Sequence, residues 1–189
     1  MTTHTAYNSI GRAKEGSTDV WVTQPHVVEF AQKRWNEGKA FDMDAAADAN
    51  NTHSTVYIDE EADALSVDWA EHYIEAIIDN PNALDLNCKT VWLNPPYGRQ
   101  MPKFLQKAYE EVQAGSVDRV VCLIACRTDT KVFHELIFAK ASEVFFIKGR
   151  LCFSGKGSAN FASCYVVFDR RRPLQDLVIT HGLITEVIE

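Results

Sequence analysis

The sequence predicts a three-layer α/β domain whose sheet is mostly parallel, with an antiparallel edge strand. Residues 91–93 and 120–126 are short apolar runs, typical of strands that are buried on both faces. Between such runs, apolar residues recur at helical spacing, as at Phe104, Leu105 and Ala108. Strands that alternate with helices favour parallel pairing through right-handed crossovers, and two successive strands near the C-terminus favour an antiparallel edge hairpin.

The N-terminal part of the chain is expected to hold one helix and two short strands. Residues 1–18 are polar and without period, and they are predicted to form a flexible arm. Thr23 is a candidate N-cap for a helix that has a proline in its first turn and ends at Gly38. A short strand then passes into a tight turn of small residues at 45–47, and residues 55–58 form a second extended segment.

The rest of the chain continues this alternation. Asp68 can cap a further helix, and Pro102 opens another helix that Gly115 ends. A polar turn at 127–130 leads into a helix, and a loop rich in Gly and Ser at 154–163 separates the last two strands. One strand of this part is expected to end at Asn94. Three further strands are expected at residues 119–126, 144–153 and 164–168.

Length and composition favour a single domain. We place it at residues 19–172, followed by a C-terminal tail at 173–189. With 46% hydrophobic and 24% charged residues, the composition is that of a soluble globular protein. No apolar run approaches the ~20 residues of a membrane span, and the N-terminus has no signal-peptide pattern. The five cysteines are odd in number and lack a Cys-x-x-Cys pair, which predicts free thiols in a reducing cytoplasm and no metal cluster.

Acidic residues are concentrated in the middle of the chain. Residues 40–87 hold twelve Asp and Glu and neither Lys nor Arg, which leaves 19 basic and 14 acidic residues outside this segment. The formal net charge of −7 therefore conceals a basic remainder that is suited to contact phosphates. Most of the twelve carboxylates are expected only to keep a face of the protein solvated.

The loop Asn94-Pro95-Pro96-Tyr97 carries the clearest functional signal. It follows the buried strand at 91–93, and its two prolines can neither continue that strand nor donate to its ladder. A turn after a parallel strand lies at the edge where open α/β sheets bind ligands. The Asn94 amide can hydrogen-bond an amino group and the Tyr97 ring can stack on a flat heterocycle, so the loop is suited to hold a nucleobase by its exocyclic amine. Taken alone, the same four residues are equally compatible with an ordinary loop.

Carboxylates at the ends of two earlier strands add a second signal. Asp44 ends the first strand, and small residues such as Ala45 follow it. The turn contains no glycines, so it is not a glycine-rich dinucleotide-binding motif. Asp59 and Asp63 follow the second strand, where an α/β nucleoside site places the acid that binds ribose hydroxyls.

Taken together, these segments resemble the phage-type DNA N-6-adenine methyltransferases, the Dam family. The resemblance implies a Rossmann-like methyltransferase fold and S-adenosylmethionine as cofactor. The sequence departs from the family at Gln24, which separates Thr23 from Pro25, and in an added helix at about 70–86. The resemblance covers roughly residues 19–169 and rests on six elements in order: Trp21-x-Thr23, Asp44-Ala45-Ala46-Ala47, Asp63 with Asp68-Trp69, the segment 93–99, the turn at 127–130, and Gly149-Arg150-Leu151-x-Phe153.

The resemblance also implies roles for individual residues. In the expected catalytic loop, Asn94-Pro95-Pro96-Tyr97, the Asn94 side-chain oxygen and the Pro95 carbonyl accept the two amine protons of a flipped adenine, and Tyr97 stacks on its ring. Asp44 is expected to bind the methionine ammonium of the cofactor, and Asp63 or Asp59 its ribose. The full set of expected cofactor-binding residues is Trp21, Thr23, Asp44, Ala45 and Asp63. The expected contacts to double-stranded DNA are Arg99, Arg127, Lys131 and Arg150.

Two alternatives stay open at this point. Methylation of the N-4 amine of cytosine needs the same acceptor pair with a different base pocket, and a non-catalytic DNA- or nucleoside-binding module can share the fold. The resemblance implies a phage or prophage protein that acts in the cytoplasm of a bacterial host, away from membranes. The sequence defines neither the DNA recognition site nor the oligomeric state, although a monomer is favoured.

Overall fold

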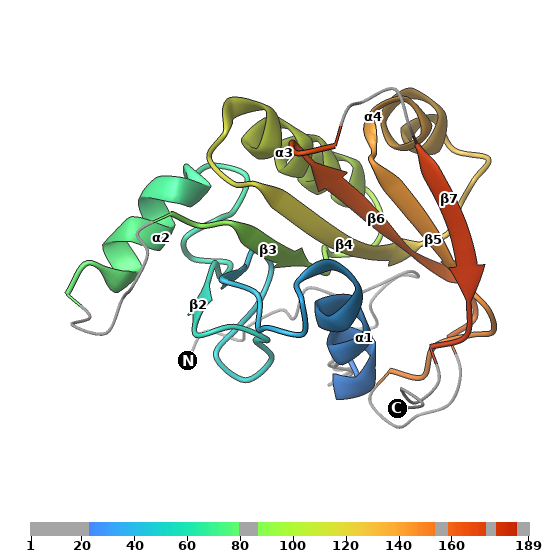
Figure 1. The fold of residues 1–189 in the computed structure, drawn as a ribbon, viewed down its shortest axis with the longest axis horizontal. Helices are drawn as coiled ribbons and strands as arrows, with labels where there is room; N and C mark the ends of the chain where they lie inside the picture. Colours follow the sequence, from blue (N-terminus) through green and yellow to red (C-terminus); the bar gives the residue numbers. More distant parts are fainter. Residues whose placement is uncertain (1–22, 80–86, 154–158, 173–176, 185–189) are drawn as a thin grey trace.

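The structure is a computed structural model that describes residues 23–79, 87–153, 159–172 and 177–184 (Figure 1). It contains one seven-stranded sheet in the order β2-β1-β3-β4-β6-β5-β7. Every neighbouring pair is parallel except those of β6, which runs antiparallel to both β4 and β5. The predicted α/β fold with a mostly parallel sheet is therefore confirmed. The strands are β1 Met43–Asp44, β2 Val56–Tyr57, β3 Thr90–Leu93, β4 Arg119–Ala125, β5 Glu143–Ile147, β6 Ser163–Asp169 and β7 Val178–Gly182.

The antiparallel part of the sheet contains the predicted hairpin and one further strand. β5 and β6 pair as the hairpin, with Phe145 opposite Tyr165. β6 lies between β4 and β5, and β7 pairs in parallel with β5 at the rim of the sheet. The sequence pattern does not predict β7, because Val178 and Ile179 are both exposed and the strand lacks the apolar alternation of a half-buried one. The expected arm at residues 1–18 lies outside the described residues.

Helices cover both faces of the sheet and complete the three predicted layers. Helix α1 (Pro25–Trp35) packs on one face with strand residues such as Trp92 and Tyr165, whereas α2 (Trp69–Ile77) and α3 (Met101–Ala114) pack on the other. Figure 1 shows α1 apart from α3 and the short helix α4 (Phe138–Lys140). Because neighbouring residues of a strand point to opposite faces, the apolar strands bury side chains under the helices on both faces of the sheet.

The helix expected after the polar turn at 127–130 contains a π-helical turn. This turn, η1 (Phe133–Ile137), precedes α4, and the Phe138 amide N–H donates to the Phe133 carbonyl, five residues back. Apolar spacing does not distinguish such a turn from an α-helix, so the sequence could not predict it. No helix among the described residues is long and apolar enough to cross a membrane.

Helix ends follow the predicted capping residues except at α1. The Asp68 carboxylate accepts from the Glu71 amide N–H at 2.9 Å, and Gly115 ends α3 in the left-handed region with φ of 83°. At α1 the N-cap is Gln24, so the predicted cap at Thr23 is wrong. The Thr23 hydroxyl instead accepts a hydrogen bond from Asn94, 71 positions away, and a local pattern cannot predict so distant a contact.

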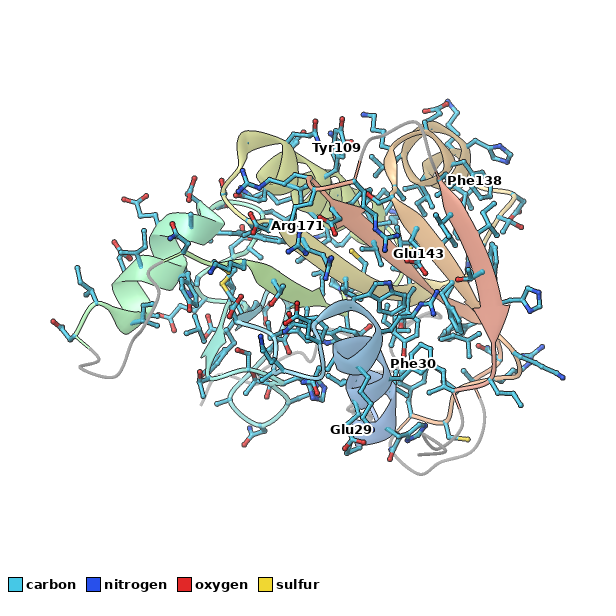
Figure 2. The ribbon with its side chains drawn as sticks, in the orientation of Figure 1. Glu29, Phe30, Tyr109, Phe138, Glu143 and Arg171 are labelled. Atoms are coloured by element: carbon cyan, nitrogen blue, oxygen red, sulfur yellow. The ribbon has the colours of Figure 1, made fainter. Side chains whose placement is uncertain are left out.

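The sheet edge at which β4 and β5 begin is held by charged hydrogen bonds. Glu143, labelled in Figure 2, is 3% exposed and accepts from Arg34 Nη2 at 2.6 Å and from Trp35 Nε1 at 3.0 Å. Arg172 approaches the same carboxylate at 3.3 Å. Burial alone would raise the pKa of Glu143, but the hydrogen bonds from Trp35 and Arg34 outweigh it and lower the pKa. The carboxylate is therefore ionised and joins α1 to the sheet.

Replacing Glu143 with Gln is expected to lower the free energy of unfolding by about 2 to 3 kcal/mol at pH 7, because the hydrogen bonds to one of its two oxygens and the negative charge are lost. The pKa of Glu143 is below 4.5, so the difference from wild type should shrink as the pH falls below that value and the carboxylate is protonated. Chemical denaturation at pH 7 and pH 3.5 measures both quantities. Glu75→Gln, at an exposed position of α2, is the matched control. Equal effects of the two substitutions would contradict the role of the ionised Glu143 carboxylate in joining α1 to the sheet.

Candidate functional site

Three neighbouring parallel strands end side by side at one edge of the sheet. Asp44 is the last residue of β1 and is paired with Trp92 of β3, and Leu93 at the end of β3 is paired with Cys122 of β4. Asn94 therefore leaves β3 beside Asp44, and Arg127 follows β4 on the same edge. Since ligands of open α/β sheets bind at the carboxyl ends of the strands, these exits define the candidate site.

The Asn94 side chain is held at one end and free at the other. Its Nδ2 donates to the Thr23 hydroxyl at 2.8 Å. Its Oδ1 is buried and has no hydrogen-bond partner among the described residues. A buried acceptor without a partner is unfavourable in a folded protein, and such an atom is a common feature of a site that a ligand completes. Asn94 Oδ1 can thus accept a hydrogen bond from a bound amine.

Unpartnered buried polar atoms gather at this same edge. His53 lies in the loop after β1, Trp92 is the penultimate residue of β3, and Ser163 opens β6 opposite Ala125 at the end of β4. Among the described residues, one unpartnered buried atom, Glu111 Oε2, lies elsewhere, in α3. Those at the edge are Asn51 Oδ1, His53 Nε2, Trp92 Nε1, Asn94 Oδ1, the Tyr97 hydroxyl and Ser163 Oγ. The edge is therefore suited to a polar ligand with several hydrogen-bonding groups.

Asp44 is the buried acid of the site. It is 2% exposed, and its carboxylate accepts from the His53 amide at 3.1 Å and from the Ala46 amide at 3.3 Å. Burial raises the pKa of Asp44 to about 7, although these two amide bonds act to lower it. The ionised form of Asp44 is thus unfavourable without a cationic partner. A bound cation would stabilise this form, so the position is suited to bind one. The neighbouring Ala45 is fully buried, and its amide donates to the Trp92 carbonyl at 2.9 Å.

The two acids that follow β2 differ in how far their oxygens are engaged. Asp63 has a left-handed backbone, with φ of 56°, and its two oxygens accept from the Leu65 amide at 3.1 Å and the Ser66 hydroxyl at 2.7 Å. Asp59 accepts one bond, from the Ala62 amide at 3.0 Å. Asp63 therefore closes its own turn with both oxygens, whereas one Asp59 oxygen makes no hydrogen bond to the described residues.

Tyr97 is held by edge-to-face contacts with two other rings. Its centroid lies 5.3 Å from that of Phe161 and 6.4 Å from that of Phe153, both at 71°. Its hydroxyl is buried without a partner, and burial raises the pKa of this group well above its ordinary value, so it is neutral. The preceding Pro95 and Pro96 are both buried. The loop thus holds the half-buried Tyr97 ring in a fixed place beside Asn94.

A cavity of about 770 Å³ adjoins Tyr97, and its lining includes four cationic side chains, one of them Lys140, together with the acid Glu135. Arg99, Arg127 and Lys131 all line it, so the fold brings together three of the four residues predicted to bind DNA. Among the described residues, none of the three makes an ion pair. Arg150 is not part of this lining, and its Nη1 donates to the Ala159 carbonyl at 3.1 Å.

Some of the predicted residues lie elsewhere, and others were missed. Trp21 falls outside the described residues. Thr23 lies at the site but contacts Asn94. Sequence reasoning assigned His53 no role, yet its ring packs at 87° to Trp92, with the centroids 6.2 Å apart, and burial lowers its pKa, which favours the neutral imidazole. Asn51 was missed too, because the loop after β1 has no motif that marks it.

Comparison with known proteins identifies the family. The model of the family described as DNA N-6-adenine-methyltransferase (Dam) matches residues 11–180. A DNA N-6-adenine-methyltransferase of Haemophilus phage HP1 (strain HP1c1) is 27% identical over 134 residues, which are 71% of this chain and 65% of that protein. One of Escherichia phage T1 is 26% identical over 133 residues, 70% of this chain and 46% of that protein. The chain thus spans under two thirds of the length of either relative.

Two solved structures are similar over most of the chain. The type IIL restriction-modification enzyme MmeI in complex with DNA has a TM-score of 0.45 and 12% identity, covering 72% of this chain and 21% of that one. The human methyltransferase 10 domain containing protein has a TM-score of 0.40 and 9% identity, covering 79% of this chain and 84% of that one. The strand order and register described above define the fold independently of these two likenesses.

Replacing Asp44 with Asn is expected to stabilise the ligand-free protein more at pH 8 than at pH 5. The pKa of Asp44 rises from 3.8 to about 7 on folding, so its contribution to stability is greatest below pH 3.8 and is lost as the pH rises through about 7. The neutral amide avoids this loss. Thermal unfolding of both proteins at the two pH values is the measurement, with Asp79→Asn at an exposed position as control. A gain that is independent of pH would contradict the burial of an ionised Asp44.

Proposed function

Because this chain belongs to the DNA N-6-adenine-methyltransferase (Dam) family, we propose that it transfers a methyl group from S-adenosylmethionine to the N-6 amine of adenine in DNA. One observation carries this proposal. The free, buried Oδ1 of Asn94 stands beside Tyr97 at the carboxyl edge of the sheet, where an exocyclic amine and its ring can be held together. The residue roles below follow from that arrangement.

Two acceptors are available for the two protons of the adenine amine. Asn94 Oδ1 is one, and the Pro95 carbonyl, to which no amide N–H of the described residues donates, is the other. The lone pair of this amine is delocalised into the ring. Accepting hydrogen bonds from both protons favours pyramidal nitrogen and localises the lone pair for attack, so the main task of the protein is positioning rather than proton removal. A strong base is not required before attack.

The candidate cofactor site fits S-adenosylmethionine in charge and in hydrogen-bonding capacity. When bound, this cofactor supplies an activated methyl group on a sulfonium. Asp44 would hold its ammonium, since a cation favours the ionised form of this buried acid. Asp63 is the ribose acid that the family pattern favours, and the freer carboxylate of Asp59 is the other candidate. Trp21, Thr23 and Ala45 complete the proposed cofactor-binding set.

Adenine in duplex DNA must leave the base stack before its amine can reach Asn94. Tyr97 is the proposed stacking partner of the extruded base. Its contacts with Phe153 and Phe161 hold the ring without a hydrogen bond to its hydroxyl, so the ring face rather than the oxygen is the functional part. Base–aromatic stacking contributes ~1–3 kcal/mol per base in other nucleic-acid complexes.

The distribution of paired and unpaired cations favours one DNA-binding edge. At the amino ends of the parallel strands, Arg119 and Arg171 pair with Asp169, and Arg170 pairs with Asp118. At the carboxyl edge the cavity beside Tyr97 collects cations that make no ion pair with the described residues, namely Arg99, Arg127 and Lys131. Unpaired cations are available to phosphates. Arg150, exposed but bonded to the Ala159 carbonyl, is a further proposed contact.

The setting of the protein follows from the same proposal. The curated relatives are phage proteins, so we propose that this chain acts on double-stranded DNA in the cytoplasm of a bacterial host. We place the main part of the domain at residues 19–172, with β7 of the C-terminal segment completing its sheet, and expect it to act as a monomer. Sedimentation of the purified chain with and without duplex DNA measures this last point.

Product analysis tests the proposed function. The chain is incubated with labelled S-adenosylmethionine and unmethylated duplex DNA, and the DNA is digested to nucleosides. We expect N-6-methyladenine. N-4-methylcytosine in its place would support the cytosine alternative, and DNA binding without any methylated product would support the non-catalytic module.

Replacing Arg127 with Gln is expected to weaken duplex binding about fivefold at moderate salt and to reduce the slope of log K against log salt by about one, because one phosphate contact is lost. Fluorescence anisotropy across a salt series measures both quantities. Arg170→Gln is the matched control, since that guanidinium pairs with Asp118 at the opposite edge. Equal weakening by the two substitutions would argue against the proposed DNA-binding edge.

A further inference from the structure

The segment before α1 reaches across the sheet edge to the loop after β3. Thr23 is 2% exposed, and its Oγ1 lies 2.8 Å from Asn94 Nδ2. It does not cap α1, whose N-cap residue Gln24 makes no side-chain bond. Among the described residues, the Thr23 hydroxyl is the one hydrogen-bond partner of the Asn94 side chain. The contact therefore connects the proposed acceptor of the amine with a separate segment of the chain.

The amide group of Asn94 has to be held in place for its Oδ1 to accept a hydrogen bond from the target amine. The oxygen and the NH₂ group of the amide are almost equal in size, so packing alone does not distinguish the two orientations. The reversed orientation would turn two donors toward the donor protons of the target amine. A hydroxyl can donate as well as accept, so the donor protons of the bound amine, and not the Thr23 contact alone, select the orientation. The Thr23 contact fixes the position of the amide group, with Nδ2 donating to Thr23 and Oδ1 left free for the ligand.

Thr23 is itself held in place by the packing of α1. The Tyr165 hydroxyl donates to the carbonyl of the buried Val27 at 2.7 Å in the first turn of α1, and the Val27 amide donates to the Gln24 carbonyl at 3.0 Å. Tyr165 belongs to β6, so the start of α1 is tied to the sheet. The Thr23 hydroxyl is therefore placed by the same sheet that places Asn94.

We propose that Thr23 is a positioning residue that holds the Asn94 side chain in the place required for methyl transfer. The inference rests on the proposed function and adds a role beyond the cofactor contact expected from the family pattern. A positioning residue acts on the chemical step through Asn94. A cofactor contact acts on the affinity for S-adenosylmethionine.

The test compares two substitutions of nearly the same size. Thr23→Val keeps the branched shape without the hydroxyl, and Thr23→Ser keeps the hydroxyl. We expect Thr23→Val to lower kcat about tenfold, the order expected for loss of one orienting hydrogen bond, with the Kd for S-adenosylmethionine within about twofold of wild type. Thr23→Ser should retain most of the wild-type kcat. The control is Thr180→Val, which removes a hydroxyl of the rim strand β7 that donates to Glu143. It should leave kcat unchanged.

The outcomes separate this inference from the proposed function. If wild type forms no methylated base, the function proposal fails. If wild type is active and Thr23→Val keeps its kcat, or weakens S-adenosylmethionine binding about tenfold while kcat is unchanged, the positioning role is wrong. Thermal unfolding verifies that the variants are folded. Should Thr23→Val be unfolded, Thr23→Ala is measured in the same way, with the same expected loss of kcat and the same contradicting results.

Discussion

Parallel pairing of β1, β3 and β4 is the constraint on which the candidate site depends. Their register brings the ends of these strands to one edge, so that Asp44, Asn94 and Arg127 leave the sheet as neighbours although they are far apart in the chain. Two prolines then stop the chain after Asn94 and prevent further strand pairing. The buried acid, the amide and the cation are each ordinary, and their chemistry arises from being placed together.

Charge is divided between the two edges of the sheet. At one edge, Glu143 and Asp169 are buried and satisfied by arginines, which makes this edge a structural one. At the other, cations of the cavity beside Tyr97 make no ion pair with the described residues, and Asp44 is a buried acid without a cation. The net charge of −7 therefore says little about where a polyanion can bind, because three of the cations that make no ion pair with the described residues line one cavity.

Much of the fold and part of the site could be predicted from the sequence. The buried strands have apolar runs, and Asp68 and Gly115 mark helix ends through local chemistry, so all of these are readable from neighbouring residues. The contact between Thr23 and Asn94 is not, because it depends on how α1 docks on the sheet. The exposed strand β7 and the loop that carries His53 likewise have no local signal. Local patterns thus predict elements, whereas the partners of a side chain follow from the tertiary fold.

The most direct test of the central claim is the effect of Asn94→Ala on two separate quantities. Equilibrium titration gives the Kd for S-adenosylmethionine, and single-turnover kinetics with unmethylated duplex DNA give the rate of methyl transfer. The account predicts near-complete loss of methyl transfer with the Kd close to that of wild type, since Asn94 Oδ1 serves the amine and not the cofactor. A variant that still methylates DNA at a rate near that of wild type would contradict the account.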